Sequence, residues 1–218
     1  MEWVLWIRVL PVLLFSVVIH ECAHGYVASR CGDETARRAG RITLNPIPHI
    51  DPFGSILLPL LLIFTGSRFL IAWAKPVPVN PANFRRPGRD DILVSLAGPC
   101  SNVMLALSFT LVAVLGQVMM RILPVPVVVA QSLVFLAQYG ILINLLLAVF
   151  NLIPIPPLDG SHILRQVLPR KGAAEFDKIS RYGFLILLVL VMTPVFRFIF
   201  FPAHVFFWLL MRFVSMFV

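Results

Sequence analysis

The stretch VVIHECAHGY, residues 17–26, decides the fold, because it places two histidines and a glutamate directly after the unbroken apolar run VLLFSVVI. An apolar run of this kind is typical of a helix inside a lipid bilayer. Each ionisable side chain within such a helix costs about 2.5 to 3.5 kcal/mol on insertion scales, so three of them so close together require a partner that compensates them. The rest of the chain has to supply that partner.

Composition places the whole chain in the membrane class. Of 218 residues, 59% are hydrophobic and only 13% are charged. This excludes an ordinary soluble protein and predicts an all-α, multi-pass membrane protein with a single domain, residues 1–218. The net charge of +8 is divided among short loops and forms no basic patch, so no nucleic acid partner is expected. The three cysteines are sparse and unpatterned, which argues against a disulfide framework and a cysteine zinc cluster.

Five apolar runs are long enough for membrane-spanning helices, which need about 20 residues each. They lie near residues 3–30, 92–120, 132–153, 182–201 and 203–218. The first run lacks the basic region and the cleavage site of a signal peptide, so we expect a retained span. Because a proline breaks a helix, Pro202 is expected to mark a tight hairpin within 182–218.

The basic residues cluster in three connecting segments. They are Arg30, Arg37, Arg38 and Arg41 in the first, Lys75, Arg85, Arg86 and Arg89 in the second, and Arg165, Arg170, Lys171, Lys178 and Arg181 in the third. By contrast, the 121–131 connection holds only Arg121. By the positive-inside rule the three basic segments are cytoplasmic, and we expect the chain in the cell (inner) membrane.

The apolar run 53–74 is constrained by that orientation. If 31–52 and 75–91 are both cytoplasmic, the run must enter and leave on the same side, and it is too short to cross twice. We therefore predict a re-entrant or membrane-surface element, interrupted near Thr65-Gly66-Ser67-Arg68. The alternative is a true span with one basic loop misplaced.

The segments that flank this run, RITLNPIPHIDP (41–52) and AKPVPVNP (74–81), are rich in proline and β-branched residues. Prolines at this spacing suit extended edge strands, and they exclude helices and central strands. We therefore expect short β-strands near 41–50 and 75–80, with ordered loops as the alternative.

His20, Glu21 and His24 form the pattern H-E-x-x-H. On a helix the two histidines share one face, one turn apart, so both imidazoles can reach one zinc ion. The carboxylate of Glu21 can take a proton from a zinc-bound water. A pair of core histidines beside a chance glutamate is the alternative, but the cost of three ionisable groups inside a span favours the metal site.

A catalytic zinc usually has three protein ligands, so one ligand is missing from the first helix. The candidates are His49, Asp51, Asp159, His162 and His204. Asp159 is favoured because it lies in FNLIPIPPLDGSHIL (150–164), where three prolines break the span before a basic loop. The expected depths of His20 and Asp159 in the membrane also agree. His20 lies about 15 Å along a helix axis from Arg30, and Asp159 is a similarly short distance from Arg165.

Other polar residues receive lesser roles. His162 is expected at the membrane interface, with an outer metal partner or a substitute ligand as alternatives. His49 and Asp51 can approach the metal as a plug, and His204 is expected at the outer surface. The segment SLAGPCSN (95–102) opens the second span with small residues that allow close helix packing, and its Asn102 is a candidate hydrogen-bond partner of the site.

Three motifs stand in order along the chain, HECAH at 20–24, LAGPCSN at 96–102 and FNLIPIPPLDG at 150–160. Together they resemble the site-2 protease family of intramembrane zinc metalloproteases. The resemblance covers about residues 10–168, and it implies that His20, His24 and Asp159 bind one zinc ion and that Glu21 is the catalytic base. It also suggests Asn151 as a group that clamps substrate or stabilises the oxyanion, and a small membrane-associated sheet between the first two motifs.

The resemblance further implies hydrolysis of peptide bonds in or beside transmembrane segments of membrane-protein substrates. The PDZ and CBS domains of larger members are absent, so the chain is similar to the short, domain-free prokaryotic members. A zinc-binding transporter is the main alternative, because broken helices and intramembrane ligands also suit transport. A non-proteolytic regulator is the other. The identity of the substrate, the oligomeric state and the role of 182–218 cannot be read from the sequence.

Overall fold

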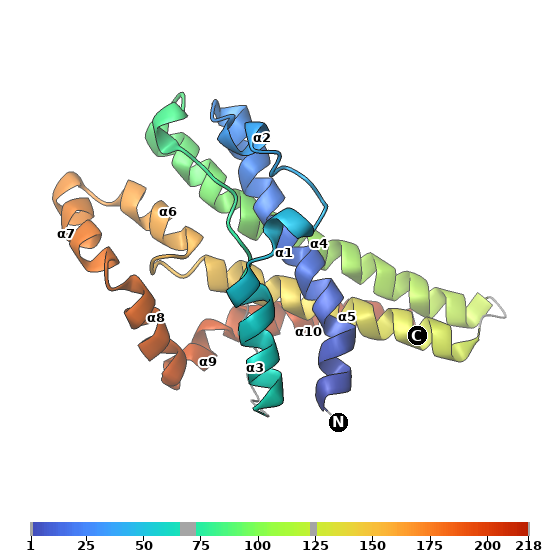
Figure 1. Cartoon of the computed structure of the whole chain (residues 1–218). Helices are drawn as coiled ribbons and strands as arrows, with labels where there is room; N and C mark the ends of the chain where they lie inside the picture. The colour runs from blue at the N-terminus through green and yellow to red at the C-terminus, as the bar shows by residue number, and fades with distance from the viewer. Residues whose placement is uncertain (1, 66–72, 123–125, 218) are drawn as a thin grey trace.

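The computed structural model describes residues 2–65, 73–122 and 126–217. Three long helices, α1 (Glu2–Cys31), α4 (Pro87–Ile122) and α5 (Val127–Asn151), form the centre of the molecule (Figure 1). The shorter helices are α2 (Thr35–Arg38), α3 (Leu58–Phe64), α6 (Asp159–Val167), α7 (Arg170–Ser180), α8 (Gly183–Met192), α9 (Val195–Ile199) and α10 (Phe201–Ser215). Single turns of 3-10 helix occur at Ile47–His49 and Pro81–Asn83, and a π-helical turn at Pro52–Leu57 precedes α3.

Among the described residues, three helices are long and apolar enough to cross a membrane, namely Arg8–Cys31 in α1, and the whole of α4 and α5. The prediction of a helical membrane protein is therefore confirmed for three spans. The predicted count of five is not. At 1.5 Å per residue, α8 and α10 measure about 15 and 22 Å, which is short of a hydrocarbon core of about 30 Å.

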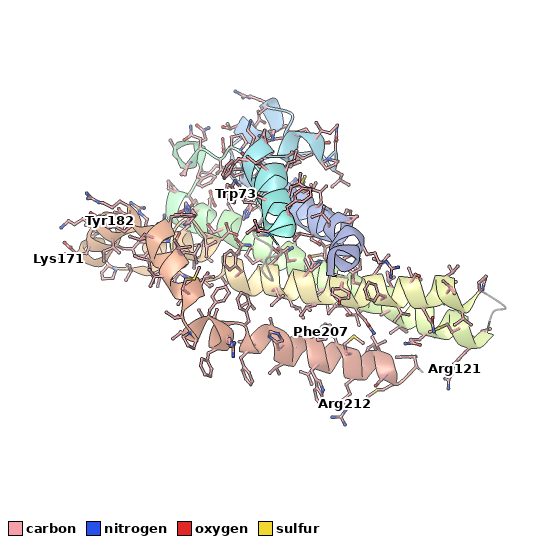
Figure 2. All side chains as sticks on the ribbon, turned by 60° about the horizontal axis from the view of Figure 1, so that its bottom comes forward. Trp73, Arg121, Lys171, Tyr182, Phe207 and Arg212 are labelled. Carbon is pink, nitrogen blue, oxygen red and sulfur yellow. The ribbon has the colours of Figure 1, made fainter. Side chains whose placement is uncertain are left out.

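The C-terminal region is interrupted twice, once after α8 and once at Phe200, two residues before the predicted Pro202. Helix α8 ends at Met192. Thr193 and Pro194 separate it from α9, and Pro202 lies in the first turn of α10. A proline in that turn starts a helix rather than stopping it, because its missing N–H would have no helical partner there. Figure 2 shows α10 running alongside α5, with Phe207 on the side toward it. The described residues 182–217 thus form three helices instead of two spans.

The two ends of the run 53–74 lie together. The Trp73 N–H donates to the Gly54 carbonyl (3.2 Å), and the Ser55 hydroxyl donates to the Trp73 carbonyl (2.7 Å). Figure 2 shows Trp73 at the beginning of the helical segment that ends in α3. This is the arrangement that entry and exit on one side requires. The predicted interruption falls mostly on residues 66–72, which lie outside the described residues.

The short strands predicted near 41–50 and 75–80 are not confirmed, since neither segment contains a strand in the structure. The two segments do lie against each other: the Lys75 N–H donates to the His49 carbonyl (2.9 Å), and the Arg41 guanidinium donates to the carbonyls of Lys75 and Pro76. The physical reason for the missing ladder is that prolines in both segments have no N–H to donate.

Helices α4 and α5 pack through small residues. Ala106, Ala113 and Ala137 are fully or almost fully buried between them. Contacts of this kind let helix backbones approach closely, which is how helices associate where apolar burial gives no advantage over lipid. Helix α1 crosses α4 and α5 (Figure 1), and the candidate site lies at this crossing.

Candidate metal centre

His20 and His24 lie one turn apart on α1, and their side chains are buried. Their Nε2 atoms are 3.0 Å apart. His24 holds its Nδ1 2.7 Å from the Val94 carbonyl, and His20 holds its Nδ1 2.6 Å from Asn102 Oδ1. Because both partners are acceptors, each imidazole donates through Nδ1. Each Nε2 lone pair is therefore left facing the other, in the tautomer that a metal ligand needs.

Asp159 completes the group from the first turn of α6. Its Oδ2 lies 3.3 Å from Nε2 of both His20 and His24. Helix α5 ends at Asn151 and α6 begins at Asp159, so the prolines break the span as predicted. Gly160 makes the return possible, because a Cβ there would lie 2.2 Å from the Leu152 carbonyl oxygen.

The three donor atoms fit one metal ion. Asp159 Oδ2 is buried and has no hydrogen-bond partner. A carboxylate oxygen and two imidazole lone pairs therefore converge without a proton between them, which is unfavourable unless a cation lies there. Separations of 3.0 to 3.3 Å match the edge of a zinc tetrahedron, which is on the order of 3.3 Å for bonds of about 2.0 Å.

Gly98 gives the histidines their room. A Cβ at this position of α4 would lie 2.4 Å from His24 Nε2 and 2.5 Å from His20 Cε1 and Nε2. Any larger residue would thus fill the space in which the donor atoms meet. The small residues of the segment 95–102 were predicted to permit close helix packing, and at Gly98 the close neighbours are the imidazoles themselves.

Glu21 lies beside the donor group and is held by the backbone. Its Oε2 accepts a hydrogen bond from the Val77 N–H (2.8 Å), and Val77 is buried. The segment 75–80 therefore passes directly over the carboxylate that the sequence marks as the candidate base.

Asp33 anchors the same segment further along. Its buried carboxylate accepts from the Asn80 N–H (2.7 Å), the Asn83 side chain (2.8 Å) and Thr35. Burial alone would raise the pKa of Asp33, but the hydrogen bonds from Thr35, Asn80 and Asn83 outweigh it and lower the pKa below its usual value. The ionised Asp33 thus fixes the loop that carries Val77.

An interior hydrogen-bond chain supports His20. Asn102 accepts from His20 through Oδ1 and donates through Nδ2 to Asn144 Oδ1 (2.9 Å). Asn144 donates in turn to Ser16 Oγ (2.8 Å) and to the Gly140 carbonyl (2.8 Å). Asn102, Asn144 and Ser16 are completely buried and come from α4, α5 and α1. The interior chain, His20–Asn102–Asn144–Ser16, therefore links the three spans to one imidazole.

A second group, the rim cluster of Asp91, His162 and Gln166, joins α4 to α6. Asp91 accepts from Gln166 Nε2 (2.6 Å) and lies 3.5 Å from His162 Nδ1. The hydrogen bond with Asp91 raises the pKa of His162, more than burial lowers it. His162 is thus engaged with Asp91 rather than with the three donor atoms. The rim cluster holds the helix that carries Asp159.

The other predicted candidates form contacts outside the donor group. Asn151 donates to the Leu147 carbonyl of its own helix (3.0 Å), and His49 is buried with Nε2 3.0 Å from the Thr43 carbonyl. Asp51 accepts from the backbone N–H groups of Phe53 and Gly54, and His204 lies 2.8 Å from the Phe200 carbonyl. Among the described residues, the group that could hold a metal consists of His20, His24 and Asp159.

Sequence reasoning missed Asn144, Ser16 and Asp91. A signal existed for Asn144, which is the one strongly polar residue in the run ILINLLLAVF (141–150). Polar residues inside spans generally face the bundle interior and find partners there. Asp91 stands among other charges at the start of α4 and gives no comparable signal.

In the described part of the chain, three apolar helices around two buried histidines and a partly buried aspartate define a multi-pass membrane protein with a donor set for one metal ion. A model of peptidase family M50 matches residues 113–193. The chain is 40% identical over 191 residues to "Putative zinc metalloprotease YwhC" of Bacillus subtilis, which covers 87% of this chain and 82% of that relative. The chain belongs to peptidase family M50, the site-2 protease family, so it is a metallopeptidase and the resemblance is confirmed.

More distant relatives agree. The chain is 32% identical over 181 residues to "Putative zinc metalloprotease Rip2" of Mycolicibacterium smegmatis, covering 83% of this chain and 65% of the relative. It is 28% identical over 174 residues to "Zinc metalloprotease MJ0392" of Methanocaldococcus jannaschii, covering 79% of this chain and 38% of the relative. No solved structure matches the chain. The metal printed in these names, zinc, is one that two imidazoles and a carboxylate suit.

Proposed function

We propose that this protein is an intramembrane zinc metalloprotease that hydrolyses peptide bonds in or next to transmembrane segments of membrane proteins. The observation that carries the proposal is the convergence of two imidazole lone pairs and an unpartnered, buried carboxylate oxygen between spans of a peptidase-family chain. His20, His24 and Asp159 hold one zinc ion in the proposed enzyme. Membership of a peptidase family favours this reading over a transporter or a non-proteolytic regulator.

The chemistry divides between the metal and Glu21. A zinc ion held by these three residues would supply Lewis-acid polarisation of the peptide carbonyl and activation of a water. Glu21 would accept a proton from the attacking water and return it to the leaving amine. The Val77 N–H keeps the Glu21 carboxylate on the site's side of α1. Asn151, at the end of α5, clamps the substrate or stabilises its oxyanion once the substrate is bound.

Substrate enters as an extended chain in this proposal. A helix in lipid hides its peptide carbonyls, so its end has to unwind before one of them can reach the metal. The segment 75–80, which passes beside Glu21, and the segment 41–50 are the parts of the backbone against which unwound substrate would lie. Residues 10–168 form the catalytic core of the single domain.

We propose that the site faces the cytoplasmic side of the cell membrane, which the positive-inside rule supports for the three basic segments. Arg30, in the last turn of α1, lies six residues beyond His24, which is about 9 Å along the helix axis. Cysteine labelling in the 121–131 connection would check the orientation, because this connection should be labelled from outside the cell. A tag placed after Val218 would report the side on which the C-terminus lies.

The decisive experiment is Glu21→Gln. The variant is expected to keep about one zinc per chain and to lose cleavage, since catalytic groups of this kind contribute about 100-fold or more to the rate. Cells that carry it should accumulate a membrane fragment, identified by mass spectrometry against wild-type cells. Glu34→Gln is the matched control, because Glu34 is exposed and pairs only with Arg38. Substantial proteolysis by a zinc-loaded Glu21→Gln variant would contradict the role given to Glu21.

A further inference from the structure

Four arginines gather around one pocket at the polar ends of two spans. Arg30 lies in the last turn of α1, Arg85 and Arg86 lead into α4, and Arg89 lies in its first turn. Together with Cys31, Asp90 and Leu93 they line a pocket of about 370 Å³, here called the arginine pocket. Figure 1 shows these two helix ends side by side, next to α2. The pocket is separate from the metal centre and has no part in the proposed hydrolysis.

The positive charge of the arginine pocket is not neutralised by the protein. In the described part of the chain, the arginines that form salt bridges are Arg38 and Arg165, and the four of the pocket form none. Asp90 is the single acid in the lining, and its Oδ2 accepts from the Arg86 backbone N–H (2.8 Å) instead of a guanidinium. Like charges held around one space repel each other unless an anion lies between them. The pocket therefore calls for an anionic ligand.

The backbone holds the arginine pocket in shape. The Arg85 N–H donates to the Cys31 carbonyl at the end of α1 (3.0 Å). Gly32 adopts a φ of +112°, and a Cβ there would lie 2.9 Å from the Asn83 carbonyl oxygen and 3.2 Å from Arg85 Cγ. Only glycine lets the chain turn this closely beneath Arg85. The guanidiniums are thus presented by a fixed turn that joins α1 to α4.

An exposed apolar stripe begins at the same pocket. Leu93 lines the pocket, and Met104, Leu107, Leu111 and Leu115 follow on the same face of α4 at spacings of three, four or eleven residues. All five side chains are at least 40% exposed. A soluble anion would use only the arginines. A molecule with a negative headgroup and long acyl chains would use the arginines and the stripe together.

We propose that the arginine pocket binds the phosphate of an anionic phospholipid, whose acyl chains lie along the near half of the stripe, from Leu93 to Met104, about 16 Å along α4 and so the depth of one leaflet. Guanidiniums bind phosphate oxygens through paired hydrogen bonds, and basic pockets at the ends of membrane helices recognise lipid headgroups in this way. Bound lipid would bridge Arg30 of α1 to Arg89 of α4, the two helices that carry His24 and Gly98.

The test measures lipid binding by the purified, zinc-loaded full chain in native mass spectrometry. Three probes are added separately: phosphatidylglycerol, phosphatidylcholine and inorganic phosphate. Wild-type protein should retain phosphatidylglycerol at least about tenfold more tightly than phosphatidylcholine, and inorganic phosphate should not compete. Equal retention of the two lipids would overturn the proposal, and effective competition by inorganic phosphate would assign the pocket to a free anion instead.

The variants locate the binding. Changing Arg85, Arg86 and Arg89 to Gln should weaken phosphatidylglycerol binding at least about tenfold. The control triple, Arg37→Gln, Arg121→Gln and Arg170→Gln, removes the same charge elsewhere and should bind as the wild type does. An equal loss in both triples would reduce the effect to general charge attraction and refute the site. If the pocket triple fails to fold, the single variant Arg89→Gln should still lose about fivefold, and undiminished binding would refute the site as well.

Discussion

The interior chain and the rim cluster support opposite sides of the same donor group, and they are built differently. The interior chain fixes His20 through Asn102, Asn144 and Ser16, all without exposure to solvent. The rim cluster holds α6 through Asp91, while the His162 side chain is 55% exposed. Solvent can replace a lost partner at the exposed rim, whereas the side chains of Asn102, Asn144 and Ser16 have no exposed surface. The histidine side of the site should therefore tolerate change much less than the aspartate side.

The largest effect is expected at Gly98, where the imidazoles touch α4 directly. Gly98→Ala should abolish stoichiometric zinc binding, a greater loss than the about 10- to 100-fold typical of an outer partner, because the new Cβ would overlap both histidines. Zinc per purified chain, measured by plasma mass spectrometry, gives the answer.

Gly172→Ala in α7 is the matched control, since its nearest neighbours would be 3.5 Å away. Replacing glycine by alanine within a helix is otherwise favourable by about 1 kcal/mol. A zinc-replete Gly98→Ala protein would show that the histidines are not confined by α4 and would remove the basis of the comparison.

The next largest effect is expected in the interior chain. Asn102→Leu should weaken zinc binding about 10- to 100-fold, because His20 loses the acceptor that fixes its tautomer. Competition with a chelator measures the affinity. Asn102→Asp still accepts from His20 but can no longer donate to Asn144, so it should restore part of the affinity. Ser108→Ala, an exposed α4 residue that bonds only to its own helix, is the control.

A smaller loss is expected at the rim. Asp91→Asn removes the negative charge that pairs with His162 and weakens the hydrogen bond from Gln166. Zinc affinity should therefore fall by less than about tenfold. The same chelator competition compares it directly with Asn102→Leu. A loss at Asp91 equal to that at Asn102 would mean that the two supports do not differ in the way their burial indicates.

The smallest effect depends on pH and concerns His162 alone. Its pKa is raised above 6.5, so its contribution to stability is fully present below that pH and is lost as the pH rises through the raised pKa. The groups that act on it are Asp91 of α4, Asp159 of its own helix and His24 of α1. His162→Gln should therefore lower the melting temperature at about pH 5.5 and leave it unchanged at about pH 9.

A constant difference in melting temperature across that pH range would exclude a role for the protonated imidazole. His204→Gln serves as the control, because His204 is exposed and contacts the Phe200 carbonyl of the preceding turn. Neither variant changes a residue of the donor group.

The sequence predicted the parts of the site that depend on residue spacing along a helix and on the free-energy cost of ionisable groups within a membrane span. H-E-x-x-H places two imidazoles on one face, and the prolines before Asp159 marked where a span ends at the depth of His20. The contact of Glu21 with Val77 was beyond prediction, because a backbone N–H leaves no trace in residue type. The steric role of Gly98 likewise depends on how α1 crosses α4.

The fold was predictable where apolar length decides it, as in α1, α4 and α5. It was predicted only in part where proline position decides it. Pro202 was expected to mark a tight hairpin, and it lies in the first turn of α10, just after α9 ends at Ile199, while Pro194 marks an additional break after α8. In 41–50 and 75–80 the same prolines that suggested edge strands also left too few donors to form a ladder.

The hydrogen bond from Val77 to Glu21 also makes the site observable without a substrate. An amide hydrogen exchanges with water only when its bond opens. The exchange rate of the Val77 amide therefore reports how often the hydrogen bond opens and leaves the Glu21 carboxylate free to accept a different proton. Hydrogen–deuterium exchange at this one amide, followed by mass spectrometry, would report how often the Glu21 carboxylate is released for its proposed role.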